Sequence, residues 1–113
     1  MNIKRGDICL AALDLVMGKE ISKTRPVVII SNDKNNEFSG TVSILPITSK
    51  NLEKIYPFEV FLPKGTGNLP KDSKVKTDQI QTIDKMRILT HIGRLKEEEV
   101  AEIEKEIKIL LSS

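Results

Sequence analysis

Residues 24–33 read Thr-Arg-Pro-Val-Val-Ile-Ile-Ser-Asn-Asp, and this stretch decides the fold. Within it, the run 27–31 is apolar and β-branched at all but its last position. Such a run predicts a strand that the sheet buries on both faces. Arg25 lies just before the run, so we expect its guanidinium at a strand end, where the sheet holds it and solvent can reach it.

A second strand is predicted for 41–47, and the sequence Pro-Ile-Thr-Ser at 46–49 spans its end. Thr48 therefore places a hydroxyl at a strand end, as Arg25 places a guanidinium. Groups of these two kinds are well suited to binding a phosphate. Spacing alone leaves other interpretations open, since Arg25 could be salt-bridged or simply exposed and Thr48 could cap a turn.

The remaining strands are predicted at 8–13, 58–62, 73–79 and 89–95, and a helix at about 96–111. In the helix, apolar residues recur at spacings of three and four, and three Glu occupy the first turn. Loops are expected at 32–36 and 63–68, and a short helix or turn at 82–87 with Thr82 or Asp84 as its cap. The order of elements predicts a mainly β fold with a C-terminal α-helix, either a small β-barrel or a strongly bent sheet.

The whole chain, 1–113, has the length of one domain, and its 39% of hydrophobic residues is typical of a globular protein. Residues 96–113 carry six Glu and three Lys, a net charge of −3; because the overall charge is +2, the rest carries +5. A mildly basic body fits an anionic partner. The N-terminus lacks the apolar segment of a signal peptide, and no apolar run approaches the roughly 20 residues that span a bilayer.

Cysteine and histidine usage excludes several chemistries. Cys9 is the only cysteine, so no intrachain disulfide can form; its apolar strand context predicts a buried thiol and a reducing, cytoplasmic setting. His91 is the only histidine, which excludes a pair of histidines as acid and base, and we expect it near the surface of a strand. No motif indicates zinc, a phosphate-binding Gly-rich loop or a cofactor. The residue types that remain suit metal-free cleavage of RNA, because the 2′-hydroxyl of RNA supplies the nucleophile.

Several ordered motifs together resemble the MazF/PemK-like toxins of type II toxin–antitoxin systems. They are Lys-Arg-Gly-Asp-Ile at 4–8, the stretches 24–33 and 46–49, the stretch 76–85, and Ile-Gly-Arg-Leu at 92–95 before the helix. The resemblance covers nearly the whole chain. It implies an SH3-like or CcdB-like small β-barrel with a C-terminal helix, assembled as a homodimer with an RNA groove along its interface.

The resemblance also implies an activity and a partner. Members of this family are ribosome-independent, sequence-specific endoribonucleases, also called mRNA interferases. They cut single-stranded RNA without a metal or cofactor and leave a 2′,3′-cyclic phosphate and a 5′-hydroxyl. A cognate antitoxin is expected to block the RNA groove with an acidic, partly disordered segment that folds on binding.

The motifs that match the family imply roles for single residues. Arg25 would stabilise the phosphate and take part in proton transfer, and Thr48 would hydrogen-bond the scissile phosphate. The residues implied to bind the substrate are Lys19, Glu20, Thr24, Ser49, Lys76, Asp78 and Gln79. Some family members have His at the position of Lys19 and Arg at the position of Lys76, so this chain favours a mechanism based on Arg25 and Thr48. The role of Asp78, as a base, an RNA contact or a turn residue, stays open.

Two other functions were weighed against the ribonuclease. Gyrase-poisoning toxins share the implied fold and act without catalysis, but they are expected to depend on an aromatic C-terminal end, and this chain ends in Leu-Leu-Ser-Ser. A non-catalytic nucleic-acid-binding barrel would present aromatic platforms for stacked bases. Aromatic residues make up only 4% of this chain, and Phe58 and Phe61 are expected on opposite faces of one strand.

Overall fold

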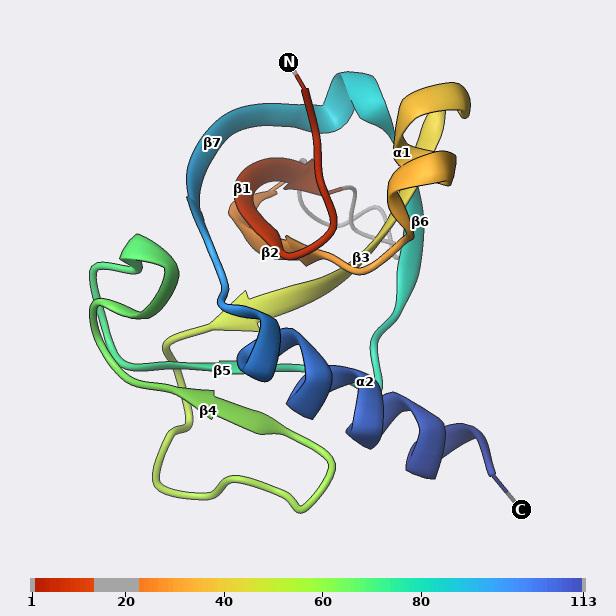
Figure 1. Cartoon of the computed structure of the whole chain (residues 1–113). Helices are drawn as coiled ribbons and strands as arrows, with labels where there is room; N and C mark the ends of the chain where they lie inside the picture. The colour runs from red at the N-terminus through yellow and green to blue at the C-terminus, as the bar shows by residue number, and fades with distance from the viewer. Residues whose placement is uncertain (1, 14–22, 113) are drawn as a thin grey trace.

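The computed structural model describes residues 2–13 and 23–112, which form a bent antiparallel sheet crossed by a C-terminal helix (Figure 1). The strands are β1 (Asp7–Leu13), β2 (Lys23–Ile29), β3 (Thr41–Thr48), β4 (Val60–Leu62), β5 (Ser73–Val75), β6 (Gln81–Asp84) and β7 (Ile88–Arg94). The helices are α1 (Asp33–Phe38) and α2 (Glu97–Leu111), with the 3-10 turns η1 (Thr66–Asn68) and η2 (Lys85–Arg87).

The sheet has the strand order β4-β5-β3-β2-β1-β7, and β6 also pairs with β3. All of these pairings are antiparallel. The predicted class, mainly β with a C-terminal helix, is confirmed. Within the described part of the chain the end strands β4 and β7 do not pair, so the sheet is strongly bent but not closed into a hydrogen-bonded barrel.

Strand β2 is buried on both faces, as its continuous apolar sequence predicts. Val27 and Ile29 lie in one hydrophobic cluster, and Val28 lies in a second cluster on the opposite face. The neighbouring strand β3 divides its side chains in the same way, with Ile44 in the first cluster and Leu45 in the second. The two central strands are therefore held by a core on each side, which fixes the positions of their ends.

Helix α2 covers the second cluster and crosses β4 and β5 in Figure 1. Ile103 is 1% exposed, and Val100 and Ile107 pack beside it. Burying a side chain such as Ile103 contributes about 1.5–3 kcal/mol. The helix begins with the Lys96 backbone N–H donating to Glu99 Oε1 at 2.8 Å. Its last turn runs beyond the sheet, so Leu111, which the periodicity placed on the buried face, is 75% exposed.

Several predicted boundaries differ from the structure. The expected loop 32–36 contains the start of α1, which Asn32 caps by accepting from the Asn35 N–H at 2.8 Å. The segment 82–87 is divided between strand β6 and the turn η2, and Asp84 caps that turn by accepting from the Met86 N–H. The strands expected at 58–62 and 73–79 are shorter, as β4 and β5.

Cys9 and His91 have the surroundings that the sequence predicted. Cys9 is fully buried, and this burial, together with the nearby charge of Asp7, raises the pKa of its thiol to about 11. His91 lies on β7 with its side chain 47% exposed, and its Nε2 is 3.3 Å from Asp7 Oδ1. In the described residues no helix has both the length and the apolar character needed to cross a membrane.

Candidate functional site

The register between β2 and β3 brings Arg25 and Thr48 together. Val27 pairs with Pro46, and continuing this register by two positions places Arg25 opposite Thr48. The regular pairing stops at Val27, next to Pro26, which has no N–H to donate. Residues opposite each other on antiparallel strands project their side chains from the same face. The guanidinium and the hydroxyl therefore leave the sheet on one side, at the end of the first hydrophobic cluster.

A surface groove of about 330 Å³ lies where these two strands separate. Its lining contains four of the predicted site residues and three neighbours: Thr24, Arg25, Pro26, Ile47, Thr48, Ser49 and Lys50. The guanidinium of Arg25 and the hydroxyl of Thr48 therefore share one groove within a single chain.

A second groove of about 240 Å³ continues from the first, because both are lined by Arg25, Thr48 and Lys50. Its other lining residues are Asn51, Lys74, Lys76 and Gln79. We call the two together the basic groove. Its side chains include one guanidinium and three ammonium groups, which makes it an attractive surface for a polyanion.

The turn after β3 gives the basic groove one of its walls. Thr48 Oγ1 accepts a hydrogen bond from the Lys50 N–H at 3.1 Å, so the hydroxyl that faces the groove also holds the start of the turn. Asn51 has φ of 56°, a left-handed conformation that Asn adopts more readily than most residues. The chain therefore turns sharply beside Thr48 and brings Lys50 to the groove.

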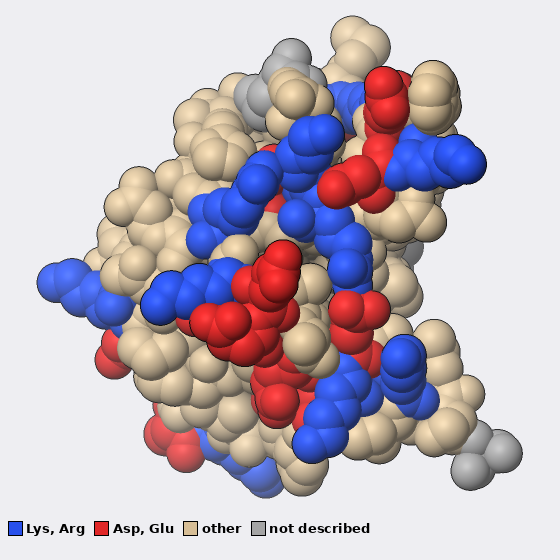
Figure 2. Space-filling view, viewed as in Figure 1, with Lys and Arg blue, Asp and Glu red and all other residues tan. Residues whose placement is uncertain are grey.

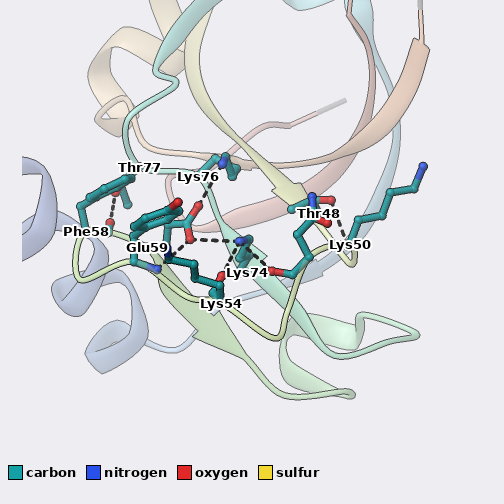
Figure 3. Close-up of polar contacts among 10 residues, drawn as sticks. Thr48, Lys50, Lys54, Phe58, Glu59, Lys74, Lys76 and Thr77 are labelled. Atoms are coloured by element: carbon teal, nitrogen blue, oxygen red, sulfur yellow. Dashed lines mark hydrogen bonds and ion pairs between the residues drawn. The ribbon is translucent and has the colours of Figure 1, made fainter.

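A buried carboxylate, Glu59, joins two lysines of the groove (Figure 3). Glu59 Oε1 is 3.0 Å from Lys74 Nζ, and Glu59 Oε2 is 2.9 Å from Lys76 Nζ. The Glu59 side chain is wholly buried and that of Lys74 is 4% exposed, whereas Lys76 is 24% exposed and reaches the groove. We call these three residues the Glu59 network.

Protonation in the Glu59 network follows from these contacts. Burial raises the pKa of Glu59, but the hydrogen bond from the Tyr56 N–H and the bonds from Lys76 and Lys74 outweigh it, so the pKa lies below its usual value. The hydrogen bond to Glu59 raises the pKa of Lys76, and the charge of Asp78 adds to the shift. Glu59 and Lys76 are therefore both charged at neutral pH and form an ion pair.

The predicted site residues are not all equally close to the groove. The structure brings together Arg25, Thr48, Thr24, Ser49, Lys76 and Gln79. Asp78 is exposed on the turn 76–79 beside Lys76 and lines neither part of the groove. Lys19 and Glu20 lie outside the described residues.

Sequence reasoning missed Lys50, Asn51, Lys74 and Glu59. A signal existed for Glu59, since it is a carboxylate between the apolar residues Phe58 and Val60 in a segment predicted to be a strand. A buried position there requires a cationic partner. The alternation of Lys74 and Lys76 around Val75 was the complementary signal.

The chemistry available at the basic groove is that of fixed cations and hydroxyls. Cys9 is buried in the first cluster, and His91 is engaged near Asp7 on β7. In the part of the chain that the structure describes, no group of three or more His, Cys, Asp or Glu residues is placed to hold a metal ion. An anion with several oxygens, such as a phosphodiester, matches the donors that line this groove.

Charge is distributed unevenly around the molecule. Figure 2 shows acidic side chains gathered over α2 with basic side chains on either side of them, so this face is of mixed sign. The cations of the basic groove belong to other parts of the fold, namely β2, β5 and the segments that follow β3 and β5. This separation agrees with the sequence, in which the acidic charge is concentrated in the last helix.

Comparison with solved structures places this fold among MazF structures. A MazE–MazF complex from Deinococcus radiodurans is similar, with a TM-score of 0.81 at 25% identity, covering 98% of this chain and 96% of that one. A mycobacterial endoribonuclease in complex with its cognate antitoxin has the same fold, with a TM-score of 0.75 at 19% identity, covering 97% and 93% of the two chains.

Sequence comparison gives the family. The model of the PemK-like, MazF-like toxin of type II toxin–antitoxin systems matches residues 4–111. Endoribonuclease MazF9 of Mycobacterium tuberculosis is 36% identical over 114 residues, which cover 96% of each chain. The chain therefore belongs to the PemK-like, MazF-like toxin family.

Proposed function

We propose that this protein is a sequence-specific, metal-independent endoribonuclease toxin that cleaves single-stranded RNA, including mRNA, in the cytoplasm. The observation that carries the proposal is the meeting of Arg25 and Thr48 in one groove that Lys50 and Lys76 also line. Family membership supports it, and so does the similarity to an endoribonuclease over nearly the whole chain.

The proposed reaction needs no nucleophile from the protein. The 2′-oxygen of one ribose bonds to the adjacent phosphorus while the bond from phosphorus to the 5′-oxygen breaks. The 2′-hydroxyl loses its proton and the leaving 5′-oxygen gains one, so the products are a 2′,3′-cyclic phosphate and a 5′-hydroxyl. Negative charge develops on the non-bridging oxygens as the phosphorus becomes five-coordinate, and the site must stabilise that charge.

Arg25 and Thr48 suit these tasks by their chemistry and their placement. The planar guanidinium of Arg25 stays charged and can donate two parallel hydrogen bonds to phosphate oxygens, which stabilises the charge that develops on them. The Thr48 hydroxyl, which stands on the neighbouring strand β3, can donate to one of the same non-bridging oxygens. Both side chains stand on strands held by two hydrophobic clusters, so they are positioned before RNA binds.

The proposed substrate contacts extend along the basic groove. Thr24, Ser49, Lys76 and Gln79 line it, and Asp78 lies on the adjacent turn. With Lys19 and Glu20, these residues are proposed to hold the nucleotides on either side of the scissile phosphate. Unpaired bases can be separated and read by polar side chains, which favours single-stranded RNA as the substrate.

We further propose that residues 1–113 form one toxin domain that assembles as a homodimer and is neutralised by a cognate antitoxin. Family membership supports the antitoxin. An acidic antitoxin segment is complementary to the basic groove and would compete with RNA for the same cations. Purified toxin mixed with its antitoxin should therefore lose RNA cleavage in proportion to complex formation.

The test of the proposed function is the replacement of Arg25. The Arg25→Ala protein should lose RNA cleavage in buffer containing EDTA while its thermal unfolding matches that of the wild type. Lys64→Ala, which removes a cation from the exposed turn between β4 and η1, should stay active and serves as the control. Full activity of Arg25→Ala would refute the proposal, and inhibition of gyrase supercoiling by both variants would support the gyrase-poison alternative.

A further inference from the structure

Residues 49–51 line the basic groove and begin the loop 49–59, which the Glu59 network ties to the sheet. Lys74 Nζ donates to the backbone carbonyls of Asn51 and Lys54, each at 3.0 Å. Glu59 Oε1 accepts from the Tyr56 N–H at 3.0 Å. One buried ion pair therefore holds three points of a loop that has no strand or helix of its own before β4 (Figure 3).

Aromatic and hydroxyl contacts complete the attachment at the far end of the loop. Thr77, which is 1% exposed, donates its hydroxyl to the Phe58 carbonyl. The rings of Tyr56 and Phe58 stack with centroids 5.4 Å apart, and Lys54 Nζ lies 4.9 Å from the Tyr56 centroid. The loop is thus ordered from Asn51 to Phe58 by contacts that converge on β5 and on the residues just after it.

The charges of the network explain why Glu59 is the critical member. The Lys74 side chain is only 4% exposed, and its only anionic contact among the described residues is Glu59. Without that carboxylate the buried charge would be uncompensated, which is strongly unfavourable. Lys76 is held by the other carboxylate oxygen and is the more exposed of the two lysines that line the groove.

We propose that Glu59 is a positioning residue for RNA binding, which fixes the groove wall through Lys74 and directs the Lys76 ammonium toward the phosphate backbone. The inference rests on the proposed function, because it assigns a role at the same groove. Glu59 is buried and would not touch the RNA. It acts by holding two cations and one loop in a single arrangement.

The proposal predicts a change in RNA affinity that is opposite in direction to the change expected from net charge alone. Replacing Glu59 with Gln removes a negative charge next to a groove that binds a polyanion, so Coulomb attraction alone would tighten RNA binding. The positioning role predicts weaker binding, because an amide nitrogen near Lys76 repels the ammonium and the loop loses its attachment. The direction of the effect therefore separates the two explanations.

The experiment measures the binding of a short single-stranded RNA that the wild type cleaves, made with a 2′-deoxy sugar at the cleavage position. Glu59→Gln should weaken binding roughly 10- to 160-fold, the loss expected for one charge-assisted hydrogen bond. Glu53→Gln makes the same charge change at an exposed position of the same loop and should leave binding equal or tighter. Equal or tighter binding by Glu59→Gln would overturn the proposal.

A second variant keeps the test valid if Glu59→Gln does not fold. Lys76→Gln alters a partly exposed side chain, so its fold should survive. Its dissociation constant should depend less on salt, with the slope against log salt reduced by about 0.7, as expected for one phosphate contact to single-stranded RNA. Lys64→Gln makes the same charge change away from the groove and should keep the wild-type slope. Equal slopes for these two variants would overturn the role of Lys76.

Hydrogen exchange distinguishes failure of this inference from failure of the proposed function. The Tyr56 amide should exchange faster in Glu59→Gln than in Glu53→Gln, whether or not RNA is the substrate. Unchanged exchange in a folded Glu59→Gln protein would show that the network does not hold the loop. Absence of RNA binding by the wild type would instead refute the proposed function.

Discussion

Replacing Thr48 with Val tests whether the hydroxyl at the end of β3 acts in the reaction rather than in the fold. Valine has nearly the same shape and keeps a β-branched residue in the strand, so the end of β3 should be preserved. The hydroxyl accepts one hydrogen bond, from the Lys50 N–H at 3.1 Å. Because Lys50 is exposed, water can satisfy that N–H, and the variant should lose no more than about 1 kcal/mol of unfolding free energy.

The expected kinetic loss is larger than the loss of stability. A hydrogen bond to a charged group contributes about 1.5–3 kcal/mol. If Thr48 donates to a phosphoryl oxygen mainly in the transition state, that energy is lost from the barrier. At about 1.36 kcal/mol for each factor of ten, kcat should fall roughly 10- to 160-fold. The KM should change little, because the lost interaction strengthens only as charge develops on the phosphate.

The assay is multiple-turnover cleavage of a fluorogenic RNA, with thermal unfolding measured on the same preparations. Thr90→Val is the matched control, because Thr90 is exposed on β7 away from the groove and undergoes the same chemical change. The control should retain wild-type kcat. A Thr48→Val enzyme within about threefold of wild type would show that the hydroxyl is not used in the reaction, whatever its position.

Two further predictions concern stability. Ile103→Ala should lower the free energy of unfolding in urea by about 2–5 kcal/mol, because Ile103 is 1% exposed on the buried face of α2. Leu111→Ala, at a 75% exposed position, should change this free energy by less than about 0.5 kcal/mol. Equal effects of the two substitutions would contradict the observed packing of the helix. The pKa of Glu59 is lower in the folded protein than its ordinary value of 4.5, so ionisation of Glu59 stabilises the folded state at pH values above 4.5. This stabilisation should decline as the pH falls from 4.5 through the lower pKa of the folded state. The stability difference between wild type and Glu59→Gln should therefore shrink on acidification below about pH 4.5, and a difference that grows in this range would contradict the assigned charge state.

The sequence predicted the elements whose patterns are set by burial. Strand β2 was predictable because four consecutive β-branched residues suit only a strand covered on both faces. Most of α2 was predictable because its apolar residues recur with the period of a helix. The exposure of Leu111 was not, since periodicity gives the face of a helix but not the length of sheet available to cover it.

Two features that depend on polar contacts were not predicted, one with local contacts and one with contacts between distant segments. Helix α1 was expected to be a loop because its residues are polar and common in turns. It forms because Asn32 caps its first turn and because Asn36 is buried, donating its side-chain amide to the Ser31 carbonyl at 2.8 Å. The partners of Glu59 could not be predicted, because Lys74 and Lys76 are on a different strand and on the turn that follows it.

The register that places Arg25 opposite Thr48 is fixed by hydrogen bonds at the other end of β2 and β3. The Ser43 N–H donates to Ser31 Oγ at 3.0 Å, and the Ile30 N–H donates to the Ser43 carbonyl at 2.9 Å. Burial alone specifies this register weakly, because a strand that is apolar on both faces can shift by one residue and still present apolar side chains to both clusters. A shift by one residue would break the bond between Ser31 and Ser43 and would also place Arg25 and Thr48 on opposite faces of the sheet. Polar contacts beside α1, at the other end of these strands, therefore help to keep the side chains of Arg25 and Thr48 together.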